Sequence, residues 1–298
     1  MIDLTPKSEA VLKASVLIPH FNDQARLRLC LDSLGAQTLP SDSFEIIVAD
    51  NGTPGGIEDI VAAYPDVQFI AVEERGAAPA RNAAMNIACG AVFAFIDSDC
   101  TASPDWLDEG LKGLANADYV GGQINVAIAA DDKPTPVEAF EVVFGFRQQL
   151  YLKRKQFSAT ANLFVTREVA KSIGPFTNRV AEDLDWGQRA AALGFRLAFN
   201  AKSIVSHPAR CNWDELTLKW DRLVQERWNG FQRHRPLDRL KWGLLAIATA
   251  FSLAPHLWRV ATSEKLKRMQ DKVAAAVVLA RIRLWRARKM LMMLVVAR

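Results

Sequence analysis

The sequence predicts an α/β fold with a mostly parallel sheet, helices on both faces of the sheet, and a helical appendage at the C-terminus. Short apolar runs of strand length alternate with helical patterns over roughly the first hundred residues. Alternation with crossovers of this length is typical of βαβ units and of a parallel sheet. The apolar runs are almost continuous, as expected for strands that helices cover on both faces.

The elements can be assigned in order along the chain. The four runs predicted as strands of the parallel sheet are ASVLIP, FEIIVAD, VQFIAV and AVFAFID. The helical patterns between them cover residues 22–37, 56–64 and 79–90. Ligands bind beyond the carboxyl ends of the strands in such sheets, so the residues directly after each strand are the ones to examine for chemistry.

Beyond about residue 115 the alternation becomes less regular. Strands are predicted at 119–128, 157–166 and 196–200, and helices at 134–151, at 181–194 and up to about residue 231. No internal repeat or low-complexity linker interrupts this part. We therefore expect one α/β domain over residues 1–236 and a separate helical segment over residues 237–298.

The cysteine content predicts a reduced, cytoplasmic protein. The chain has four cysteines, none of them in a CxxC pair or at a spacing typical of zinc ligands, and it opens without a signal peptide. The net charge of +4 is unevenly distributed. Residues 258–298 hold 11 Lys and Arg against two Asp and Glu, whereas the rest of the chain is acidic. A basic tail of this kind indicates anionic lipid or nucleic acid as a partner, or a solvated helix face.

Two aspartates follow the fourth predicted strand, in the sequence AVFAFIDSDC. Asp97 and Asp99 are separated by one residue, so both carboxylates are expected on the same side of the chain. Carboxylates at the end of a strand are suited to Mg²⁺ or Mn²⁺, which also bind substrate phosphate oxygens. A cation there would offset the repulsion between the two charges. A DxD pair also occurs often by chance.

The sequence lacks the glycine-rich loops of other nucleotide-binding α/β proteins. No GxGxxG follows the first strand, and no GxxxxGK[ST] is present. Dinucleotide dehydrogenases and P-loop enzymes are therefore disfavoured. Side chains such as Arg75 or Arg81, together with a metal, are then expected to hold the phosphates.

Six segments in order resemble family 2 glycosyltransferases, over about residues 14–235. The segments are SVLIPHFND, FEIIVADNGTPGG, ERGAAPARNAAMNIACGAVFAFIDSD, SATANLFVTREVAKSIGPF, AEDLDWGQRAAALGFRL, and VSHPARCNWDEL with RWNGF. The resemblance implies a GT-A fold and inverting transfer of a sugar from a nucleotide diphosphate sugar, with UDP as the carrier by analogy. The acceptor that it implies is a lipid-linked saccharide or another cell-surface glycan precursor.

The resemblance also implies roles for particular residues. Pro19 and Asn22 would shape the nucleotide pocket, Asp50 would accept a hydrogen bond from the base, and Arg81 would contact the nucleotide or the pyrophosphate. Asp97 would lie near the ribose and the metal, and Asp99 would ligate the metal directly. Asp183, with Glu182 beside it, corresponds to the general base, and a histidine near His207 ligates the metal in some relatives.

Several of these residues have a simpler structural explanation. Asp50 could be a turn residue in DNGTPGG, the carboxylates of residues 182–185 could be ordinary first-turn helix residues, and His207 could be packed in the core. Two departures from the family pattern also matter. Asn51 replaces the second acidic residue after the second strand, and QERW at residues 225–228 is one residue short of the QxxRW motif of processive members. Extrusion of a long polymer is therefore not expected.

Two alternatives to a glycosyltransferase stay open at this point. A nucleotidyltransferase that makes a nucleotide sugar shares the strand order and the need for metal, but it would normally carry a glycine-rich loop after the first strand. A membrane scaffold with a degenerate transferase domain is the other alternative, which the intact Asp50, Asp97, Asp99 and Asp183 disfavour.

The C-terminal segment is predicted to associate with a membrane. Residues 242–258 contain no Asp, Glu, Lys or Arg, but the run is shorter than the roughly 20 apolar residues that a spanning helix needs. Residues 273–298 mix arginine with leucine, methionine and tryptophan. We expect interfacial helices on the cytoplasmic face of the inner membrane, bound peripherally or inserted shallowly. Nucleic acid is disfavoured because the charges alternate with apolar residues, and a helical hairpin packed on the catalytic domain or on a dimer partner is the alternative.

Overall fold

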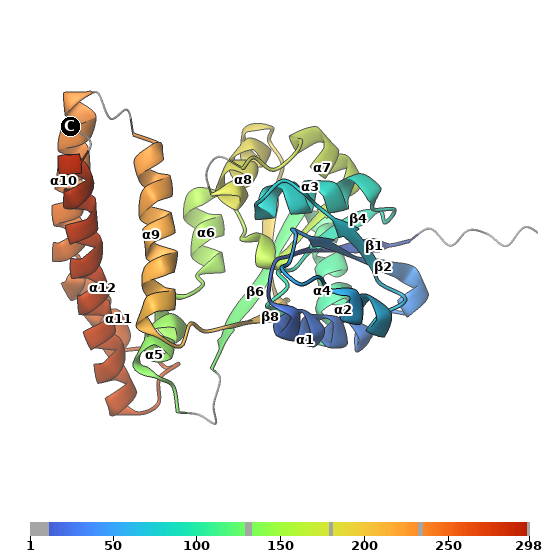
Figure 1. The fold of residues 1–298 in the computed structure, drawn as a ribbon, viewed down its shortest axis with the longest axis horizontal. Helices are drawn as coiled ribbons and strands as arrows, with labels where there is room; N and C mark the ends of the chain where they lie inside the picture. The colour runs from blue at the N-terminus through green and yellow to red at the C-terminus, as the bar shows by residue number, and fades with distance from the viewer. Residues whose placement is uncertain (1–11, 129–132, 179–180, 232–234, 297–298) are drawn as a thin grey trace, which may run out of the picture. The chain divides into compact units, whose positions relative to one another are not determined.

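The computed structural model describes residues 12–128, 133–178, 181–231 and 235–296 (Figure 1). The chain forms two compact units. Unit 1 comprises residues 1–124 and 148–207, and unit 2 comprises residues 125–147 and 208–298.

Unit 1 is built on an eight-stranded sheet with the order β3-β2-β1-β4-β7-β6-β8-β5. Its strands are β1 (Ala14–His20), β2 (Phe44–Asp50), β3 (Gln68–Ala71), β4 (Val92–Phe95), β5 (Thr101–Ala102), β6 (Tyr119–Ala127), β7 (Leu163–Thr166) and β8 (Leu197–Pro208). The four predicted strands β1 to β4 pair in parallel. The pairs β4–β7, β6–β7 and β5–β8 are antiparallel, so the sheet is mixed. The predicted α/β class is confirmed.

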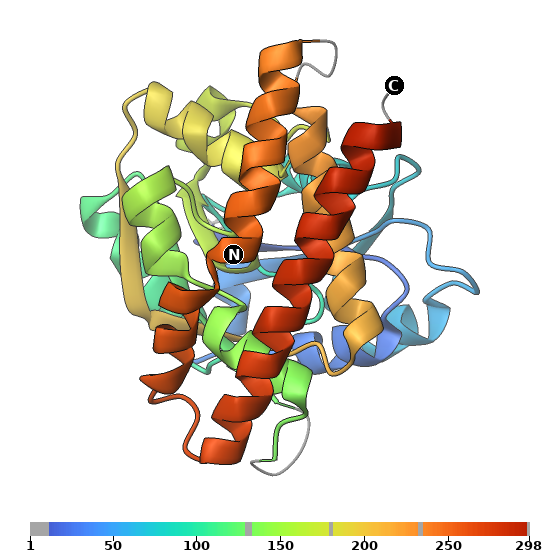
Figure 2. The same cartoon turned by 90° about the vertical axis from the view of Figure 1, so that its left-hand side faces the viewer.

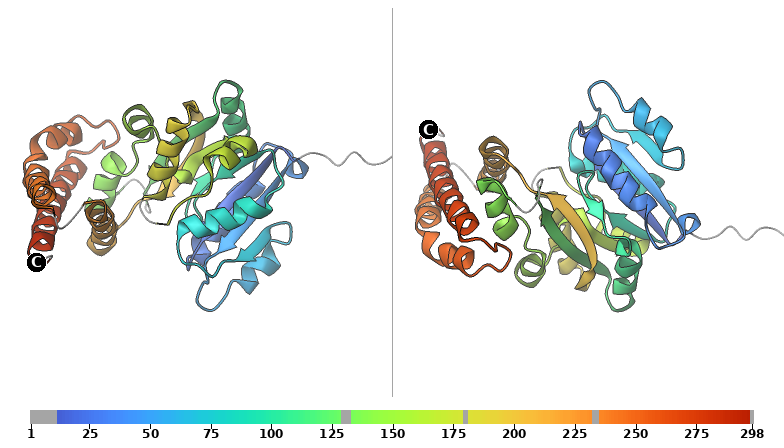
Figure 3. Two further views of the ribbon diagram at one scale, coloured as in Figure 1. Left: turned by 90° about the horizontal axis from the view of Figure 1, so that it is seen from above. Right: turned by 90° about the horizontal axis from the view of Figure 1, so that it is seen from below.

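Helices cover both faces of this sheet (Figure 3). They are α1 (Gln24–Gly35), α2 (Glu58–Ala63), α3 (Ala77–Ile87), α4 (Trp106–Gly113), α6 (Gln148–Lys155), α7 (Arg167–Ile173) and α8 (Glu182–Ala192), with 3-10 turns η1 (Ser41–Ser43), η2 (Leu114–Asn116) and η3 (Thr160–Asn162). One core cluster joins β1, β2, β4, β6 and β7 to α3, α7 and α8, and its large members include Leu17, Phe93, Phe95, Tyr119 and Trp186. Trp186 stacks on Phe176 with ring centroids 5.2 Å apart, which fixes α8 against the sheet.

Several elements differ from the sequence prediction, among them β8, which continues to Pro208 beyond the expected end at residue 200. The helix expected over residues 134–151 is broken into α5 (Pro136–Phe144) and α6, with Gly145 closing the first of them. The strand expected over 157–166 forms only at its C-terminal end, as β7. In the residues before β7, hydrogen bonds to a buried side chain take the place of strand pairing. Gln148 accepts a hydrogen bond from the amide of Ala159 at 3.1 Å and donates one to Ser158 Oγ at 2.9 Å.

Unit 2 is helical and consists of α5, α9 (Trp213–Asn229), α10 (Pro236–Phe251), α11 (Leu253–Ala261) and α12 (Met269–Val296). Figure 2 shows α10 and α12 side by side, with α9 behind them. A core cluster brings Val137, Phe140 and Val143 of α5 against Val278, Leu279 and Ile282 of α12. Unit 2 thus groups α5 and α9 with the C-terminal helices, and the expected division of the chain at residues 236 and 237 stays a prediction.

A buried ion cluster ties α5 to the start of α9 within unit 2. The side chain of Glu141 is only 3% exposed, and its carboxylate lies 2.8 Å from Arg210 Nη1 and 3.1 Å from Lys219 Nζ. A buried carboxylate is tolerated when cations neutralise it in this way. The cluster therefore fixes the chain that leaves β8 against α5.

Candidate functional site

The carboxyl ends of β1 and β2 bring together three of the residues assigned to the nucleotide. Pro19 and Asp50 lie on neighbouring strands, with His20 opposite Asp50 in the register. The Asp50 carboxylate accepts hydrogen bonds from Thr53, from its amide at 3.1 Å and from Oγ1 at 2.5 Å. The amide of Asn22 donates to the same Thr53 Oγ1 at 2.9 Å, with Asn22 in the left-handed region at φ 51°. Thr53 thus connects the two loops, a role that the sequence analysis missed.

Asn51, which replaces an expected acidic residue, organises the loop after β3. Its Nδ2 donates to the carbonyls of Val72 at 3.1 Å and Glu74 at 2.6 Å. Its Oδ1 accepts from the amide of Gly76 at 2.6 Å. An amide side chain both donates and accepts, which a carboxylate cannot do when ionised. The asparagine therefore holds the loop that leads into α3.

The DxD pair lies in a turn beyond β4. Ile96 is fully buried, whereas Asp97 and Asp99 are partly exposed, and the amide of Cys100 donates to the Asp97 carbonyl at 3.0 Å. The two carboxylates have different partners. Asp97 Oδ1 lies 2.7 Å from Arg81 Nη2, and Asp99 Oδ2 lies 3.3 Å from His207 Nε2. The turn thus presents one carboxylate to α3 and the other to β8.

Arg81 bridges the DxD turn and the predicted general-base segment. Its side chain, on α3, is 4% exposed, and its Nη1 lies 2.9 Å from Glu182 Oε1 while its Nη2 holds Asp97. A guanidinium presents its donors in a fixed fork, so it fixes the distance between two acceptors. The contact to nucleotide or pyrophosphate that the family resemblance implies for Arg81 stays a prediction.

Asp183 lies in the first turn of α8, next to Glu182. Its Oδ1 accepts a hydrogen bond from the amide of Leu184 at 2.7 Å. Burial, and then the neighbouring charge of Glu182, raise the pKa of Asp183 to about 6. A carboxylate with a pKa near neutrality is suited to accept a proton in a reaction at physiological pH.

Asp99 and His207 have the chemistry of metal ligands. A carboxylate oxygen and an imidazole nitrogen 3.3 Å apart can both turn toward one divalent cation. Burial raises the pKa of Asp99, and Asp97 raises it further, so a cation nearby would favour the charged form. Among the described residues no group of three or more His, Cys, Asp or Glu is arranged to hold a metal. Mg²⁺ or Mn²⁺ here would need further ligands from water or phosphate, as is usual for such sites.

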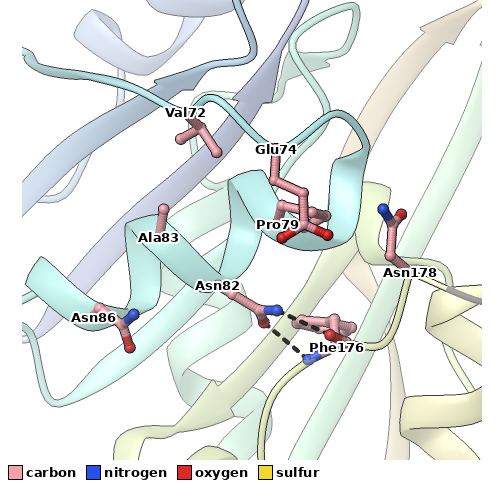
Figure 4. A pocket seen from close by; sticks show the side chains of 8 residues that line it. All are labelled: Val72, Glu74, Pro79, Asn82, Ala83, Asn86, Phe176 and Asn178. Atoms are coloured by element: carbon pink, nitrogen blue, oxygen red, sulfur yellow. Dashed lines mark hydrogen bonds between the residues drawn. The ribbon is translucent and has the colours of Figure 1, made fainter.

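A separate hollow of about 360 Å³ lies beside α3 (Figure 4). Its lining includes Asn82 and Asn86 of α3, Glu74 and Asn178. Asn82 is already engaged, because it accepts from the amide of Phe176 at 2.8 Å and donates to the same residue's carbonyl at 2.9 Å. None of the predicted site residues lines this hollow.

The chain belongs to glycosyl transferase family 2. The family model matches residues 15–174, more than half of the chain. The glycosyltransferase AglE of Haloferax volcanii is 32% identical over 205 residues, which cover 66% of this chain and 67% of that protein. Two further curated glycosyltransferases are matched over only 28% and 23% of their own length. The protein is a glycosyltransferase, and the nucleotidyltransferase alternative is set aside because all the relatives named are glycosyltransferases.

Solved structures confirm the GT-A type of fold. The mannosyltransferase PcManGT from Pyrobaculum calidifontis, in complex with GDP-Man and Mn²⁺, matches with a TM-score of 0.59 at 19% identity over 94% of this chain and 85% of that one. Residues 1–349 of S. aureus TarS in complex with UDP match with a TM-score of 0.53 at 17% identity, over 93% of this chain and 92% of that one. At these identities the likeness concerns the fold alone.

Proposed function

We propose that this protein is an inverting glycosyltransferase in which Asp183 is the general base. The bridge from Asp97 through Arg81 to Glu182 is the observation that carries the proposal, because it links the DxD turn to the residue beside Asp183. The acceptor hydroxyl would lose its proton to Asp183 as its oxygen bonds to the anomeric carbon. The bond between that carbon and the diphosphate oxygen breaks in the same step, from the opposite face of the sugar.

The donor is proposed to be a nucleotide diphosphate sugar, with UDP as the first carrier to test. Pro19, Asn22 and Asp50 would form the nucleotide side of the site, and Asp50 would have to share or exchange its hydrogen bonds with Thr53 to reach a base. Asp97, Asp99 and His207 would hold Mg²⁺ or Mn²⁺, and a cation bound there supplies charge stabilisation for the diphosphate leaving group. The GDP-Man and UDP complexes of the structural neighbours support a nucleotide donor and leave its base open.

The test of this proposal compares two neighbouring aspartates of α8. Asp183→Asn keeps size and polarity but cannot accept the proton, so transfer should fall by roughly 10²-fold or more while donor affinity is nearly kept. Asp185→Asn is the matched control, because the Asp185 carboxylate already accepts hydrogen bonds from Thr177 Oγ1 and Arg189 Nε, each at 3.0 Å. Normal turnover in Asp183→Asn would place the base elsewhere, with Glu182 the next candidate. A wild-type chain that neither transfers nor hydrolyses any nucleotide sugar would favour the scaffold alternative.

We further propose that unit 2 binds the cytoplasmic face of the inner membrane peripherally, next to a lipid-linked acceptor. One helical stretch among the described residues, 236–261, is apolar and long enough to cross a bilayer by length and composition alone. The exposed apolar residues of α10 follow helical spacing and form one stripe: Leu237, Leu240, Leu244, Ile247 and Phe251; Trp258 is exposed on α11. The opposite face is used for packing, with Trp242 and Ala246 fully buried. A stripe on one face, with the other face in a protein core, is typical of a helix lying in the interface.

Vesicle binding tests the membrane proposal independently of catalysis. The full chain should sediment with vesicles of anionic lipid and be only partly released by salt, because apolar burial adds to the charge attraction. Replacing Phe251, 82% exposed, and Trp258, 73% exposed, by serine should release it. Leu218→Ser, at a position of α9 that is 75% exposed, is the control and should sediment as before. A full chain that stays in the supernatant with such vesicles would contradict the proposal.

A further inference from the structure

The hollow beside α3 is formed by three stretches of unit 1 that are far apart in sequence (Figure 4). One face of α3 supplies Pro79, Asn82, Ala83 and Asn86, which follow the three- and four-residue spacing of a single helix face. The loop after β3 forms one wall of the hollow, and the segment before α8 forms another. The hollow thus has walls from two loops and a floor from a helix.

The wall before α8 is held in place by the core and by α3. The ring of Phe176 stacks on Trp186 and meets the Phe95 ring edge-on, with ring centroids 5.4 Å apart in the second pair. Asn82 binds both the amide and the carbonyl of Phe176. This wall is therefore fixed to the floor of the hollow.

The loop after β3 is tied to the same wall. Asn178 Nδ2 donates a hydrogen bond to the Arg75 carbonyl at 2.8 Å. Gly76, at φ 129°, lies so close to Asn178 Oδ1 that a Cβ atom at this position would clash with it. Asn51 holds the Glu74 carbonyl and the Gly76 amide. The hollow is consequently preformed, as small-molecule sites usually are.

Two polar side chains at the hollow keep their hydrogen-bonding capacity. Within the described parts of the chain, the Glu74 carboxylate forms no salt bridge, and neither this carboxylate nor the Asn86 amide has a hydrogen-bond partner. Both side chains are exposed. Figure 4 shows Glu74 near one end of the α3 face and Asn86 near the other. A ligand that lies along this face can therefore bind to both.

The chemistry of the lining disfavours anions and nucleotides. The described lining residues comprise one glutamate, three asparagines and four apolar residues, and none of them is Lys, Arg or His. Phosphates and carboxylates pair best with such cations. The one aromatic residue of the lining, Phe176, is only 3% exposed, so it offers no open ring face on which a base could stack. The hollow is therefore not a second nucleotide site.

The lining matches a neutral saccharide. Sugar hydroxyls both donate and accept hydrogen bonds, as the Asn86 amide does, and they can donate to the Glu74 carboxylate. The C–H face of a sugar ring can contact Val72, Pro79 and Ala83. A volume of about 360 Å³ is at the lower end of the range of about 300–1,000 Å³ for small-molecule sites. This size suits one or two sugar units.

We propose that this hollow binds a neutral saccharide unit, with Glu74 and Asn86 as the groups that recognise its hydroxyls. The saccharide can be a sugar of the acceptor glycan away from the reacting hydroxyl, or it can be a free saccharide. Both present the same hydroxyls and the same C–H face. The site requires neither that Asp183 is the base nor that unit 2 binds a membrane.

Saturation-transfer NMR of the full chain tests the site with four probes, the methyl glycosides of glucose, galactose, mannose and N-acetylglucosamine. At least one of them should receive saturation from the wild-type protein. Asn86→Leu should abolish this signal, because leucine fills the hollow and neither donates nor accepts a hydrogen bond. Glu74→Gln should raise the dissociation constant about fivefold, because a charge-assisted hydrogen bond becomes a neutral one. Glu73→Gln is the matched control, since Glu73 is an exposed neighbour that does not line the hollow, and it should bind as wild type.

Two further measurements separate binding from other roles. Glu74 and Asn86 are exposed and have no partners to lose among the described residues, so both variants should melt at the wild-type temperature. Asp183→Asn should keep the glycoside signal, so a wrong assignment of the base leaves this test intact. A signal that is unchanged in both Asn86→Leu and Glu74→Gln would overturn the proposal. So would an equal loss in Glu73→Gln, or the absence of a wild-type signal with all four probes.

The source of the saccharide is distinguished by chain length. The methyl glycoside that binds best is compared with the di- and trisaccharide of the same sugar. Affinity that rises with length assigns the hollow to a glycan chain, which extends beyond it, and equal affinity assigns it to a free saccharide. In either case Asn86→Leu must weaken binding and Glu73→Gln must not.

Discussion

Acidification should inhibit transfer at a pH where an ordinary aspartate would still be fully ionised. Burial and the charge of Glu182 raise the pKa of Asp183 to about 6, from an ordinary value of 3.8. With a pKa of about 6, the carboxylate is roughly nine-tenths ionised at pH 7 and about one-tenth ionised at pH 5. A general base works only when ionised, so kcat/KM should rise about tenfold from pH 5 to pH 7 and then level off. An aspartate at its ordinary pKa would change by less than about 10% over that range.

The assay must separate Asp183 from the other carboxylate with a raised pKa. Protonation of Asp99, whose pKa burial also raises, would weaken donor binding in the same direction. We therefore measure kcat/KM for the acceptor at saturating donor from pH 4.5 to pH 8, and donor affinity separately by calorimetry at each pH. The acidic limb of the profile is the fall in kcat/KM at low pH. Where this limb persists at saturating donor, it reports on Asp183.

A substitution at Arg81 tests the direction in which Arg81 shifts the pKa of Asp183. Arg81 favours the charged form of Asp183, so Arg81→Met should move the limb to higher pH, provided that the variant still melts cooperatively. The residual activity of Asp183→Asn should show no limb near pH 6. A wild-type limb near pH 4, or an unchanged limb in Asp183→Asn, would refute the assignment of Asp183 as the base.

Three other perturbations have expected outcomes. Asp99→Asn should abolish the increase in donor affinity that Mn²⁺ produces, while the fold stays intact. If calorimetry with Mn²⁺ gives wild type and Asp99→Asn the same donor affinity, Asp99 is not a ligand of the metal. Glu141→Gln leaves two cations without their buried anion, so the free energy of unfolding from a urea titration should fall by about 3 kcal/mol, and an unchanged urea midpoint would show that the cluster is not stabilising. A chain ending at Pro236 should aggregate, because it exposes the α5 and α9 side chains that α12 covers; a soluble, donor-binding product would instead favour the expected boundary at residue 236.

The sheet could be predicted from the sequence where local pattern decides it. Phe93 and Phe95 belong to an apolar run that is buried on both faces, and such a run has few other stable arrangements. The segment before β7 could not be predicted in this way. Its sequence FSATANLFVT has strand propensity throughout. However, Gln148 of α6 forms hydrogen bonds with Ser158 Oγ and with the amide of Ala159, so the first half of the segment does not pair as a strand. Local strand propensity takes no account of a hydrogen-bond partner such as Gln148, which is ten residues from Ser158 in sequence.

The sequence could name candidate site residues one by one, but it could not show how they are connected. Motif spacing indicated Asp97 and Asp99, and the family resemblance implied Asp183; the structure places all three at the ends of elements of unit 1. Arg81 links Asp97 to Glu182, the residue beside Asp183, and is 101 residues from Glu182 in sequence. A contact at that separation is set by the tertiary fold, and so are the hydrogen bonds from the Asn22 amide to Thr53 and from the Gly76 amide to Asn51.

In the C-terminal apolar run, the structure separates buried from exposed side chains, which the hydropathy pattern alone does not distinguish. Residues 242–258 are apolar on all sides, which is compatible with either a core helix or a membrane helix. In unit 2, Trp242 and Ala246 are in the core, whereas Ile247 and Phe251 are exposed, so one run supplies both kinds of surface. Apolar side chains that face solvent are favoured by lipid, so the exposed side of this run is the surface that we test with vesicles.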